Sequence, residues 1–501
     1  MNRLRYILLL SLLLCSATVG AQTYEQVVRR NFWNASQNIT GVRQDSLSRS
    51  YAEAIGEYEG GEFRDSWHPE QCWSVGAATA SIRHMDKMSL KGSFSFTQTD
   101  GYDMCGSMFI NPGYYPVDIL EFTPGRKTLQ TYAFDGGIAY DLTPAWRIGA
   151  MMDFESANIA KRKDLRYSNW MLDLKVAPGV MYHKGDWSFG ASYIYRKTSE
   201  SVEATQIGVS ESSYYAFLDK GLMYGVYNIW TDRSLHLDEA GVKSFPVKEI
   251  TNGFAIQAQY KGFFAEAEYR HTSGTIGEKE YIWFLFPGNS ADLHLGYRHE
   301  GEKAQHYARL DFGWKSCTMD ETVLEKVTEG GVSTVVNHGQ NLIQSERSWG
   351  LKPEYEYVSD RIEVLAAAHV GVDEEVSSQM YPHLYWQSLT TYGADVRVRY
   401  YVGRLVLAGQ LGYGAGRVKT DSWKTGTQTG VQTSPYRLQE YYHWQMEYAT
   451  AQRMSVGLSL RWNIWKGLYV EARANLNHAF DLKYIKGNNR IGTTIAIGYN
   501  Y

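Results

Sequence analysis

The chain of 501 residues is poor in proline and cysteine and has no long apolar run. It contains 11 Pro and 4 Cys, and nothing after Leu14 offers the consecutive apolar residues of a membrane helix, which needs about 20 of them. No helical membrane span is therefore expected in the body of the chain. The formal net charge is only -4, which excludes the strongly basic footprint of a nucleic-acid-binding protein.

Signatures of common enzyme classes are also missing. The sequence has no G-x-S-x-G, H-E-x-x-H or phosphate-loop pattern, so no nucleophile, zinc site or nucleotide site is indicated. We therefore predict no enzymatic activity, no catalytic residues, no cofactor and no metal. A barrel hydrolase or protease would need an acid, a base and a nucleophile that converge at the outer rim.

Residues 1–21 have the pattern of a secretory signal peptide. Arg3 and Arg5 supply the positive charge, Tyr6–Leu14 is a short apolar run, and Val19–Ala21 ends in small residues. The mature chain is expected to start near Gln22. Lipidation at Cys15 is the minor alternative, because the preceding residue is a leucine and not a small residue.

The composition separates the two remaining kinds of exported protein, soluble and barrel-forming. The chain has 38 Tyr, 15 Trp and 47 Gly, with a mean hydropathy of -0.39. A transmembrane β-barrel has this profile, because only alternate strand residues meet lipid while the lumen and loops are polar.

Residues of alternating polarity recur along the whole chain, as barrel strands of about 9 to 11 membrane-crossing residues require. A soluble sandwich or propeller also alternates, but its strands average 5 to 6 residues. The runs found here are longer and end in aromatic residues, as interfacial girdles do. They include 146–154, 170–182, 187–195, 254–260, 362–370, 392–400 and 454–464.

The connections between these runs alternate between short turns and long loops, which predicts short periplasmic turns and long extracellular loops. Two periplasmic chain ends require an even number of strands, which makes Arg49–Arg64 the first strand. We predict an all-β, transmembrane, antiparallel up-and-down barrel over residues 49–501 with about 18 strands, or 16 if Ile282–His299 is miscounted. Residues 22–48 form an N-terminal periplasmic or lumenal arm, with a short helix or extended segment at Tyr24–Ala35. The predicted long loops are Gly101–Arg126, Ser201–Ile250, Met319–Gln344, Asp373–Ser388 and Thr420–Glu440.

The last strand places Ile497, Tyr499 and Tyr501 on one face and ends on an aromatic residue. This is typical of the terminal signal that the barrel-assembly machinery reads by strand pairing. It predicts the bacterial outer membrane as the location, with membrane lipid and the assembly machinery as partners.

Three segments carry a family resemblance: Ala21-Gln22, Gly61–Arg64 and Leu90–Phe96. With them the chain resembles an uncharacterised family of Bacteroidota outer-membrane β-barrel proteins. The resemblance covers most of the chain and implies a role in nutrient or cofactor uptake. It implies no catalytic residues.

If the apolar residues of each strand face lipid, the alternate residues face the lumen. Many of these lumen-facing residues are charged. The favoured interpretation is a salt-bridged interior that fixes strand register. The alternative is a selective constriction, in which Arg397, Arg399 and Arg473 face the Glu266–Glu268 and Glu354–Glu356 pairs. The lumen-facing candidates are Glu266, Glu268, Arg270, Glu354, Glu356, Asp395, Arg397, Arg399, Glu471 and Arg473.

Cysteine and histidine leave few chemical options. Cys72 and Cys105 are both expected at the extracellular rim, where a disulfide is one alternative and free thiols the other, and Cys317 would stay unpaired. His294, His299 and His306 straddle a hairpin, and His294 and His299 face opposite sides of one strand, which favours scattered surface histidines over a ligand cluster.

The leading functional hypothesis is a channel or a component of an uptake system for an unidentified solute. In it the outer loops, chiefly Ser201–Ile250, contact the ligand or a partner. The rival is a plugged barrel that scaffolds another outer-membrane protein. The balanced lumen charge is compatible with both.

Overall fold

A computed structural model describes residues 24–205, 216–221, 227–229, 244–278, 281–380, 383–420 and 438–501. The predicted signal peptide, residues 1–21, and the predicted mature start at Gln22 lie outside the described residues.

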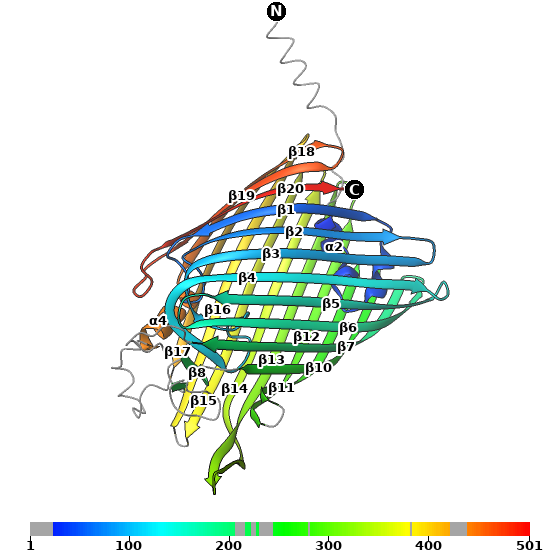
Figure 1. Cartoon of the computed structure of the whole chain (residues 1–501). Coiled ribbons are helices and arrows are strands. Elements are labelled where there is room, and N and C mark those ends of the chain that lie inside the picture. The colour runs from blue at the N-terminus through cyan, green and yellow to red at the C-terminus, as the bar shows by residue number, and fades with distance from the viewer. Residues whose placement is uncertain are drawn as a thin grey trace, which may run out of the picture.

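Within the described residues the chain forms one closed antiparallel β-barrel of eighteen strands, as the alternation predicted (Figure 1). Each barrel strand pairs with its neighbours along the chain, except that β7 pairs with β10 and β20 returns to pair with β1. Two further short strands, β8 and β9, lie between β7 and β10. The strands are β1 Arg49–Gly60, β2 Gln71–His84, β3 Met88–Ser107, β4 Asp118–Asp141, β5 Trp146–Lys161, β6 Arg166–Lys184, β7 Trp187–Thr205, β8 Ala216–Asp219, β9 Tyr227–Ile229, β10 Phe245–Tyr260, β11 Phe263–Glu278, β12 Tyr281–Glu300, β13 Ala304–Glu329, β14 Val332–Ser359, β15 Ile362–Met380, β16 His383–Val402, β17 Leu405–Thr420, β18 Arg453–Trp465, β19 Leu468–Ala479 and β20 Asn489–Asn500.

The strands form because their side chains suit two different environments on opposite faces. In β18, exposed and less exposed positions alternate, and the exposed ones include Leu458 at 66% and Trp462 at 50%. Large apolar side chains this exposed favour lipid over water as their surroundings. The other face points into the barrel and carries the polar residues.

Closure depends on the first and last strands. Strand β20 pairs with β19 on one side and with β1 on the other, with Tyr51 opposite Asn500. The predicted first strand within Arg49–Arg64 and the doubtful strand near Ile282–His299 are both present, as β1 and β12. The higher of the two predicted strand counts is therefore right.

The two ends of the barrel differ. At one end, which we call the short-turn end, all connections between barrel strands are short. Tyr501 and Ser50 exchange backbone hydrogen bonds at this end. At the other end, the long-strand end, strands project further, up to the 28 residues of β14.

Several predicted long loops are in fact strands. Met319–Gln344 continues as β13 and β14, which turn at Gly330 and Gly331, both with positive φ. Asp373–Ser388 is mostly β15 and β16, and the loop between β3 and β4 shrinks to residues 108–117. The expectation was wrong because alternation weakens outside the lipid belt, where neither face needs to be apolar, while backbone pairing continues.

The remaining two predicted loops are only partly within the described residues. In Ser201–Ile250, β8 pairs with β4, whereas 206–215, 222–226 and 230–243 lie outside them. Thr420–Glu440 runs into a helix that was not predicted, α4 (Leu438–Thr450).

The lumen at the long-strand end contains an apolar core. Residues 108–117 fold into it, and Met108 and Val117 are fully buried there. They pack against inward-facing residues of several strands, among them Phe245, Phe284 and Met319. The barrel is thus packed like a soluble protein in this part.

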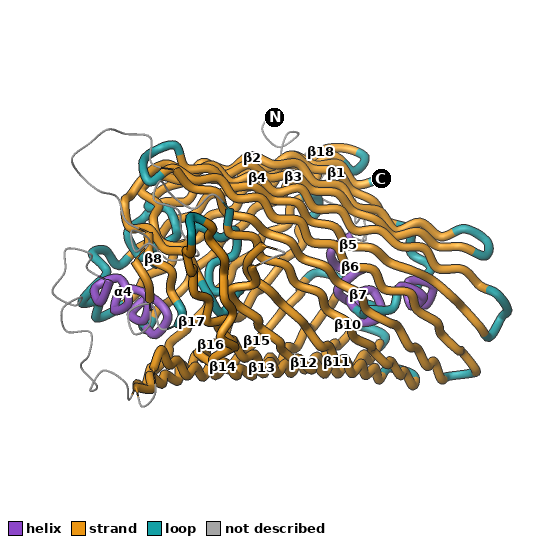
Figure 2. Tube along the Cα trace, turned by 60° about the horizontal axis from the view of Figure 1, so that its bottom comes forward, coloured by secondary structure: helices purple, strands orange, loops and turns teal. Residues whose placement is uncertain are grey.

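Inside the barrel, near the short-turn end, lies the segment before β1 (Figures 1 and 2). It begins with α2 (Tyr24–Arg30) and continues through the 3-10 turns η1 (Phe32–Ala35) and η2 (Ile39–Gln44). We call residues 24–48 the arm. Helix α4 lies at the opposite end of the barrel (Figure 2). Neither α2 nor α4 has the length and apolarity of a bilayer-spanning helix, and no other described helix does.

The disulfide alternative for Cys72 and Cys105 is wrong. All three described cysteines are free and buried. The register places Cys72 opposite Gly101, four positions short of Cys105, whose thiol donates a hydrogen bond to the Ser66 carbonyl oxygen at 3.2 Å. Cys317 is free, as expected.

Candidate functional site

The wall of the barrel leaves room for the arm through inward-facing glycines. A Cβ on Gly179 would lie 2.4 Å from Asn38 Oδ1, and one on Gly296 would lie 2.8 Å from the Phe32 ring. Real Cβ atoms do not approach other atoms this closely. These two positions therefore need glycine for the arm to lie where it does.

The arm is bound to β14 and β15 by charge. Arg30 Nη2 lies 3.0 Å from Glu356 and 2.6 Å from Glu363, and Arg29 lies 3.2 Å from Glu354. Burial lowers the pKa of Arg30, but the two carboxylates outweigh burial, so that its pKa is raised and the guanidinium stays charged. A buried, charge-assisted pair of this kind costs several kcal/mol when one partner is removed.

On another part of the wall, at β6, β10 and β11, the arm is held by neutral contacts. Asn38 Nδ2 donates to the Val180 carbonyl oxygen at 3.0 Å and to Gln257 Oε1 at 3.1 Å. Trp33 is 2% exposed and packs edge-on against Phe264, with ring centroids 5.2 Å apart. The arm thus bridges two walls of the barrel.

A cavity of about 1940 Å³ lies beside the arm, and we call it the basic cavity. Turn residues Gly403, Lys466 and Gly467 line it, so it reaches the short-turn end. Its lining contains eight arginines and one lysine against three glutamates. The basic residues are Arg29, Arg309, Arg361, Arg397, Arg399, Arg404, Arg461, Lys466 and Arg473, and the acidic ones are Glu53, Glu354 and Glu471.

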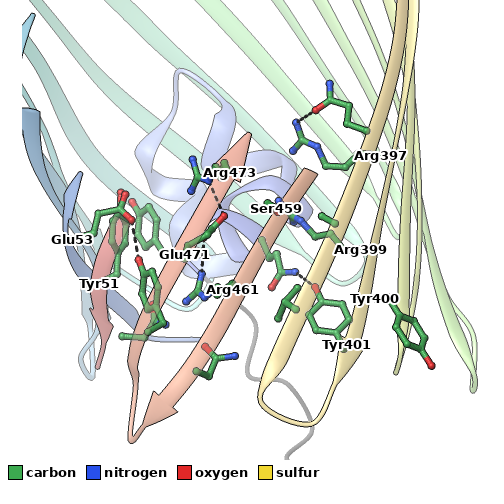
Figure 3. Close-up of a pocket in the computed structure, with 18 of the residues that line it drawn as sticks. Tyr51, Glu53, Arg397, Arg399, Tyr400, Tyr401, Ser459, Arg461, Glu471 and Arg473 are labelled. Carbon is green, nitrogen blue, oxygen red and sulfur yellow. Dashed lines mark hydrogen bonds and ion pairs between the residues drawn. The ribbon is translucent and has the colours of Figure 1, made fainter. Parts of the chain in front are cut away.

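The side chains of β16, β18 and β19 face one another across this cavity (Figure 3). Glu471 lies between two guanidinium groups, 2.7 Å from Arg473 Nε and 4.0 Å from Arg461 Nη1. Arg397 donates only to the neutral Gln410 Oε1, at 3.2 Å. Within the described residues, no carboxylate forms an ion pair with Arg397, so its charge is available to a solute.

A second cavity, of about 720 Å³, lies on the side of the long-strand end, and we call it the acidic cavity. Tyr114 and Pro116 from the infolded loop line it together with Gln37 of the arm. Burial raises the pKa of Tyr114, so this hydroxyl stays protonated. The lining holds six acidic residues, Asp153, Asp173, Glu249, Glu268, Asp292 and Asp373, and four basic ones, Lys175, Arg196, Arg270 and Lys315.

The structure does not bring all the predicted lumen-facing residues together. Arg397, Arg399, Glu471, Arg473 and Glu354 line the basic cavity, whereas Glu268 and Arg270 line the acidic one. Three others line neither cavity. Asp395 lies on the inward parity of β16, Glu356 holds the arm, and Glu266 accepts a hydrogen bond from the Gln37 backbone N–H at 3.1 Å.

The predicted constriction, with three arginines facing both glutamate pairs, is therefore not formed. Glu266 and Glu268 are separated from Arg397 and its neighbours because they lie on another wall, against another part of the arm. On the outer face, Ile497, Tyr499 and Tyr501 are exposed at 55%, 43% and 65%.

Several other residues belong to the site. Arg361, Arg404 and Arg461 line the basic cavity but were not among the ten predicted lumen-facing residues. Their position on the polar parity of strands or in short turns was a usable signal. His294 was assigned to a scattered surface set, but its Nδ1 lies 2.7 Å from Asp311 Oδ1 on the lumen side.

Comparison with known proteins gives several weak structural likenesses and one family. The structure is similar to the copper transporter OprC, with a TM-score of 0.43 and 8% identity over 91% of this chain and 80% of that one. It is similar to a mutant of the ferric enterobactin receptor of Pseudomonas aeruginosa, with a TM-score of 0.43 and 8% identity over 91% and 81% of the two chains. For Pseudomonas aeruginosa OpdK, solved with vanillate, the TM-score is 0.34 at 8% identity, over 91% of this chain and 98% of that one.

No curated protein matches the sequence. A family model does match residues 40–501, which include the whole barrel. The chain therefore belongs to the Family of unknown function (DUF6850).

Proposed function

We propose that this protein is an outer-membrane barrel in a transport or uptake system, and that its basic cavity receives an anionic solute. The observation that carries the proposal is the lining of that cavity, with nine cationic side chains against three glutamates. Rings of arginine and lysine select anions in known pores. Planar guanidinium groups also bind carboxylate and phosphate groups in two-point contacts.

The size of the basic cavity supports passage or a large ligand. Its volume of about 1940 Å³ exceeds the roughly 300–1,000 Å³ of ordinary small-molecule pockets. It is also continuous with the short-turn end, which we place in the periplasm. On this orientation the long-strand end, with its apolar core and its acidic cavity, meets the cell exterior.

The exposed aromatic and apolar outer face supports the outer-membrane location. We further propose that the assembly machinery inserts the barrel through its last strand, whose Ile497, Tyr499 and Tyr501 point outward. From the family resemblance of the sequence, we also propose that the protein comes from a member of the Bacteroidota.

Flux measurements test the proposed function. Proteoliposomes carrying the barrel should take up small organic anions faster than neutral solutes of equal size, because guanidinium charge concentrates anions in the lumen. Replacing Arg397 and Arg399 by glutamine should remove most of this preference. Arg166→Gln is the matched control, since Arg166 begins β6 at the long-strand end and pairs with Asp164 outside both cavities.

No flux of any solute, with the arm present and with residues 22–48 deleted, would contradict the transport role. Flux that is equally fast for anionic and neutral solutes would keep transport but contradict the role of the basic cavity.

The second candidate is a plugged barrel that scaffolds another outer-membrane protein. The observation in its favour is the arm, which is tied to both walls by ion pairs and by close packing. A scaffold should co-purify in mild detergent with one partner in a fixed ratio and show no flux. A barrel that purifies alone and conducts would remove this candidate.

A further inference from the structure

From the side chains that two neighbouring strands bring together, we infer a binding site for a divalent transition-metal ion at Glu266, Glu268 and His294. One potential ligand atom from each residue lies within 4.8 Å of the other two. The site lies on the inner face of β11 and β12, where Glu266 is directly opposite His294. It is separate from the basic cavity, and the inference does not rest on the proposed function.

The register of the sheet builds this site. Residue 266 of β11 pairs with 294 of β12, which pairs with 311 of β13, so that a glutamate, a histidine and an aspartate form one row across three strands. Glu268 lies two residues further along β11, on the same face. Directly opposed residues have Cβ atoms about 4.5–5.5 Å apart, which is short enough for a shared ion.

His294 is oriented as metal-bound histidines are. Its Nδ1 lies 2.7 Å from Asp311 Oδ1. With Nδ1 donating its proton to this carboxylate, Nε2 keeps the lone pair and is the ligand atom. A carboxylate that holds the second nitrogen of an imidazole is the usual outer partner of a metal ligand, because it fixes the tautomer and makes the ring more basic.

The carboxylates of this region exceed its cations. Arg270 is shared between Glu268, at 2.9 Å, and Asp292. Glu266 is only 2% exposed, and its hydrogen bonds come from neutral groups, Gln257 Nε2 at 2.7 Å and the Gln37 backbone N–H at 3.1 Å. Among the described residues, no basic side chain forms an ion pair with Glu266. A buried carboxylate without a cation is costly, and a bound metal ion removes this cost.

Glu268 has a cation nearby, but the hydrogen bonding of its carboxylate is incomplete. This side chain is 2% exposed, and its Oε1 receives no hydrogen bond of good geometry from the described residues, although it lies 2.9 Å from Arg270 Nε. A carboxylate oxygen that is buried and poorly bonded here is suited to a metal ion.

The donor set defines the class of metal. One imidazole nitrogen and two carboxylate oxygens suit Zn²⁺, Mn²⁺ or Fe²⁺ better than the soft Cu⁺ or the all-oxygen sites of Ca²⁺. Zn²⁺ holds such ligands at about 2.0–2.2 Å, so the three atoms would approach one another by about 1 Å on binding. Three protein ligands leave a fourth position open for water or a solute group.

Access to the site is from the acidic cavity. Glu268 and Arg270 line this cavity together with Gln37, and the excess of acidic over basic residues in its lining attracts cations. Because Glu266 also holds the arm through Gln37, a bound ion would steady the arm at this point.

Metal binding to the tag-free, full-length barrel in detergent tests the inference, with Zn²⁺ as the probe and metal content measured after equilibrium dialysis. The wild-type protein should retain one Zn²⁺ per chain. His294→Gln and Glu266→Gln should each lower the affinity at least 100-fold, and Asp311→Asn about 10- to 100-fold, as changes in the outer partner of a ligand do. Heat-modifiable migration in gels shows whether each variant is folded.

His299→Gln is the matched control, because His299 lies on the same strand but on its exposed, outward face. It should bind Zn²⁺ as the wild type does. Substitution of Co²⁺ gives a second measurement, in which the visible absorption should report nitrogen and oxygen ligands and should vanish in His294→Gln. Wild-type protein without stoichiometric Zn²⁺, or folded His294→Gln and Glu266→Gln variants that bind as the wild type does, would overturn the inference.

Discussion

The two lumen cavities have opposite charge, although the same kind of strand builds both. The basic cavity is lined mainly by β16 to β19 and reaches the short-turn end, whereas the acidic cavity is lined by β5 to β15 beneath the infolded loop. In the acidic cavity most charges are paired across strands, as Arg196 is with Asp173 at 2.7 Å. In the basic cavity Arg397 has no such partner among the described residues. Paired charge stabilises the wall, and unpaired charge is available for a solute.

The arm maintains this difference, since residues of the arm line both cavities. Releasing the arm should let the two cavities merge. This is the most direct way to remove the difference in charge between them. Arg30→Gln removes the cation shared by Glu356 and Glu363, while Glu356 keeps Arg29 and Glu363 keeps Arg399 as a partner. Because neither carboxylate is left without a cation, we expect a loss of about 1.5–3 kcal/mol in arm docking.

Hydrogen exchange of residues 24–48 measures this loss. The double variant Arg30→Gln with Glu363→Gln should recover part of the protection, because two neutral amides can bond to each other. Unchanged exchange in the single variant would show that the ion pairs do not hold the arm.

A large side chain at Gly179 should push the arm away from β6. In Gly179→Leu the new Cβ would lie 2.4 Å from Asn38 Oδ1, so the arm must shift, at a cost of about 1–3 kcal/mol. Trypsin should then cleave the arm at Arg29 and Arg43 faster than in the wild type. Gly350→Leu is the control, because a Cβ there meets nothing closer than 3.7 Å. Equal cleavage of both variants would refute the packing argument.

Reversing one charge in the basic cavity tests whether this cavity selects the ions that pass. A charge at 4 Å changes the energy of a passing ion by about 1 kcal/mol even in bulk water, so that Arg397→Glu should lower the anion-to-cation permeability ratio about fivefold or more. The measurement is the reversal potential in a planar bilayer under a salt gradient. A ratio unchanged by this substitution would mean that ions do not pass Arg397.

The smallest effect is expected in the acidic cavity. Asp373→Asn removes one of six acidic side chains from a lining that also holds four basic ones. The anion preference should therefore rise by less than a factor of two in the same bilayer assay. A change as large as that of Arg397→Glu would show that the acidic cavity, and not the basic one, controls ion passage.

Much of the barrel was predictable from the sequence, because one physical rule acts on every strand. A lipid-facing side chain must be apolar, which fixes the period of two and hence the inward position of residues such as Arg397 and Glu471. The even strand count follows from chain ends on one side, and it correctly predicted a strand within Arg49–Arg64, although that strand ends at Gly60. Beyond the lipid belt the rule does not apply, and there three of the five long loops were predicted wrongly.

Two missed elements did carry local signals. Gly330-Gly331 is a dipeptide typical of tight hairpins, which could have identified the turn between β13 and β14. Tyr441, Trp444 and Tyr448 are spaced three and four apart, the period of a helix, in what proved to be α4.

The clusters inside the barrel could not be predicted in the same way. Which inward residues meet depends on the register between strands and on the course of the arm, and neither is written in the pattern of a single strand. Glu266 and His294 are opposed only because β11 and β12 pair in one register. The glycines that make room for the arm, such as Gly296, look like any other strand glycine until the arm is in place.

The reversal potential of the full-length and arm-deleted proteins in planar bilayers, under a tenfold KCl gradient, tests the central claim most directly. If the basic cavity governs passage, each form that conducts should prefer Cl⁻ to K⁺, and the preference should fall when Arg397 and Arg399 are replaced by glutamine. A preference for K⁺ in either form, or no conductance in both, would contradict the account.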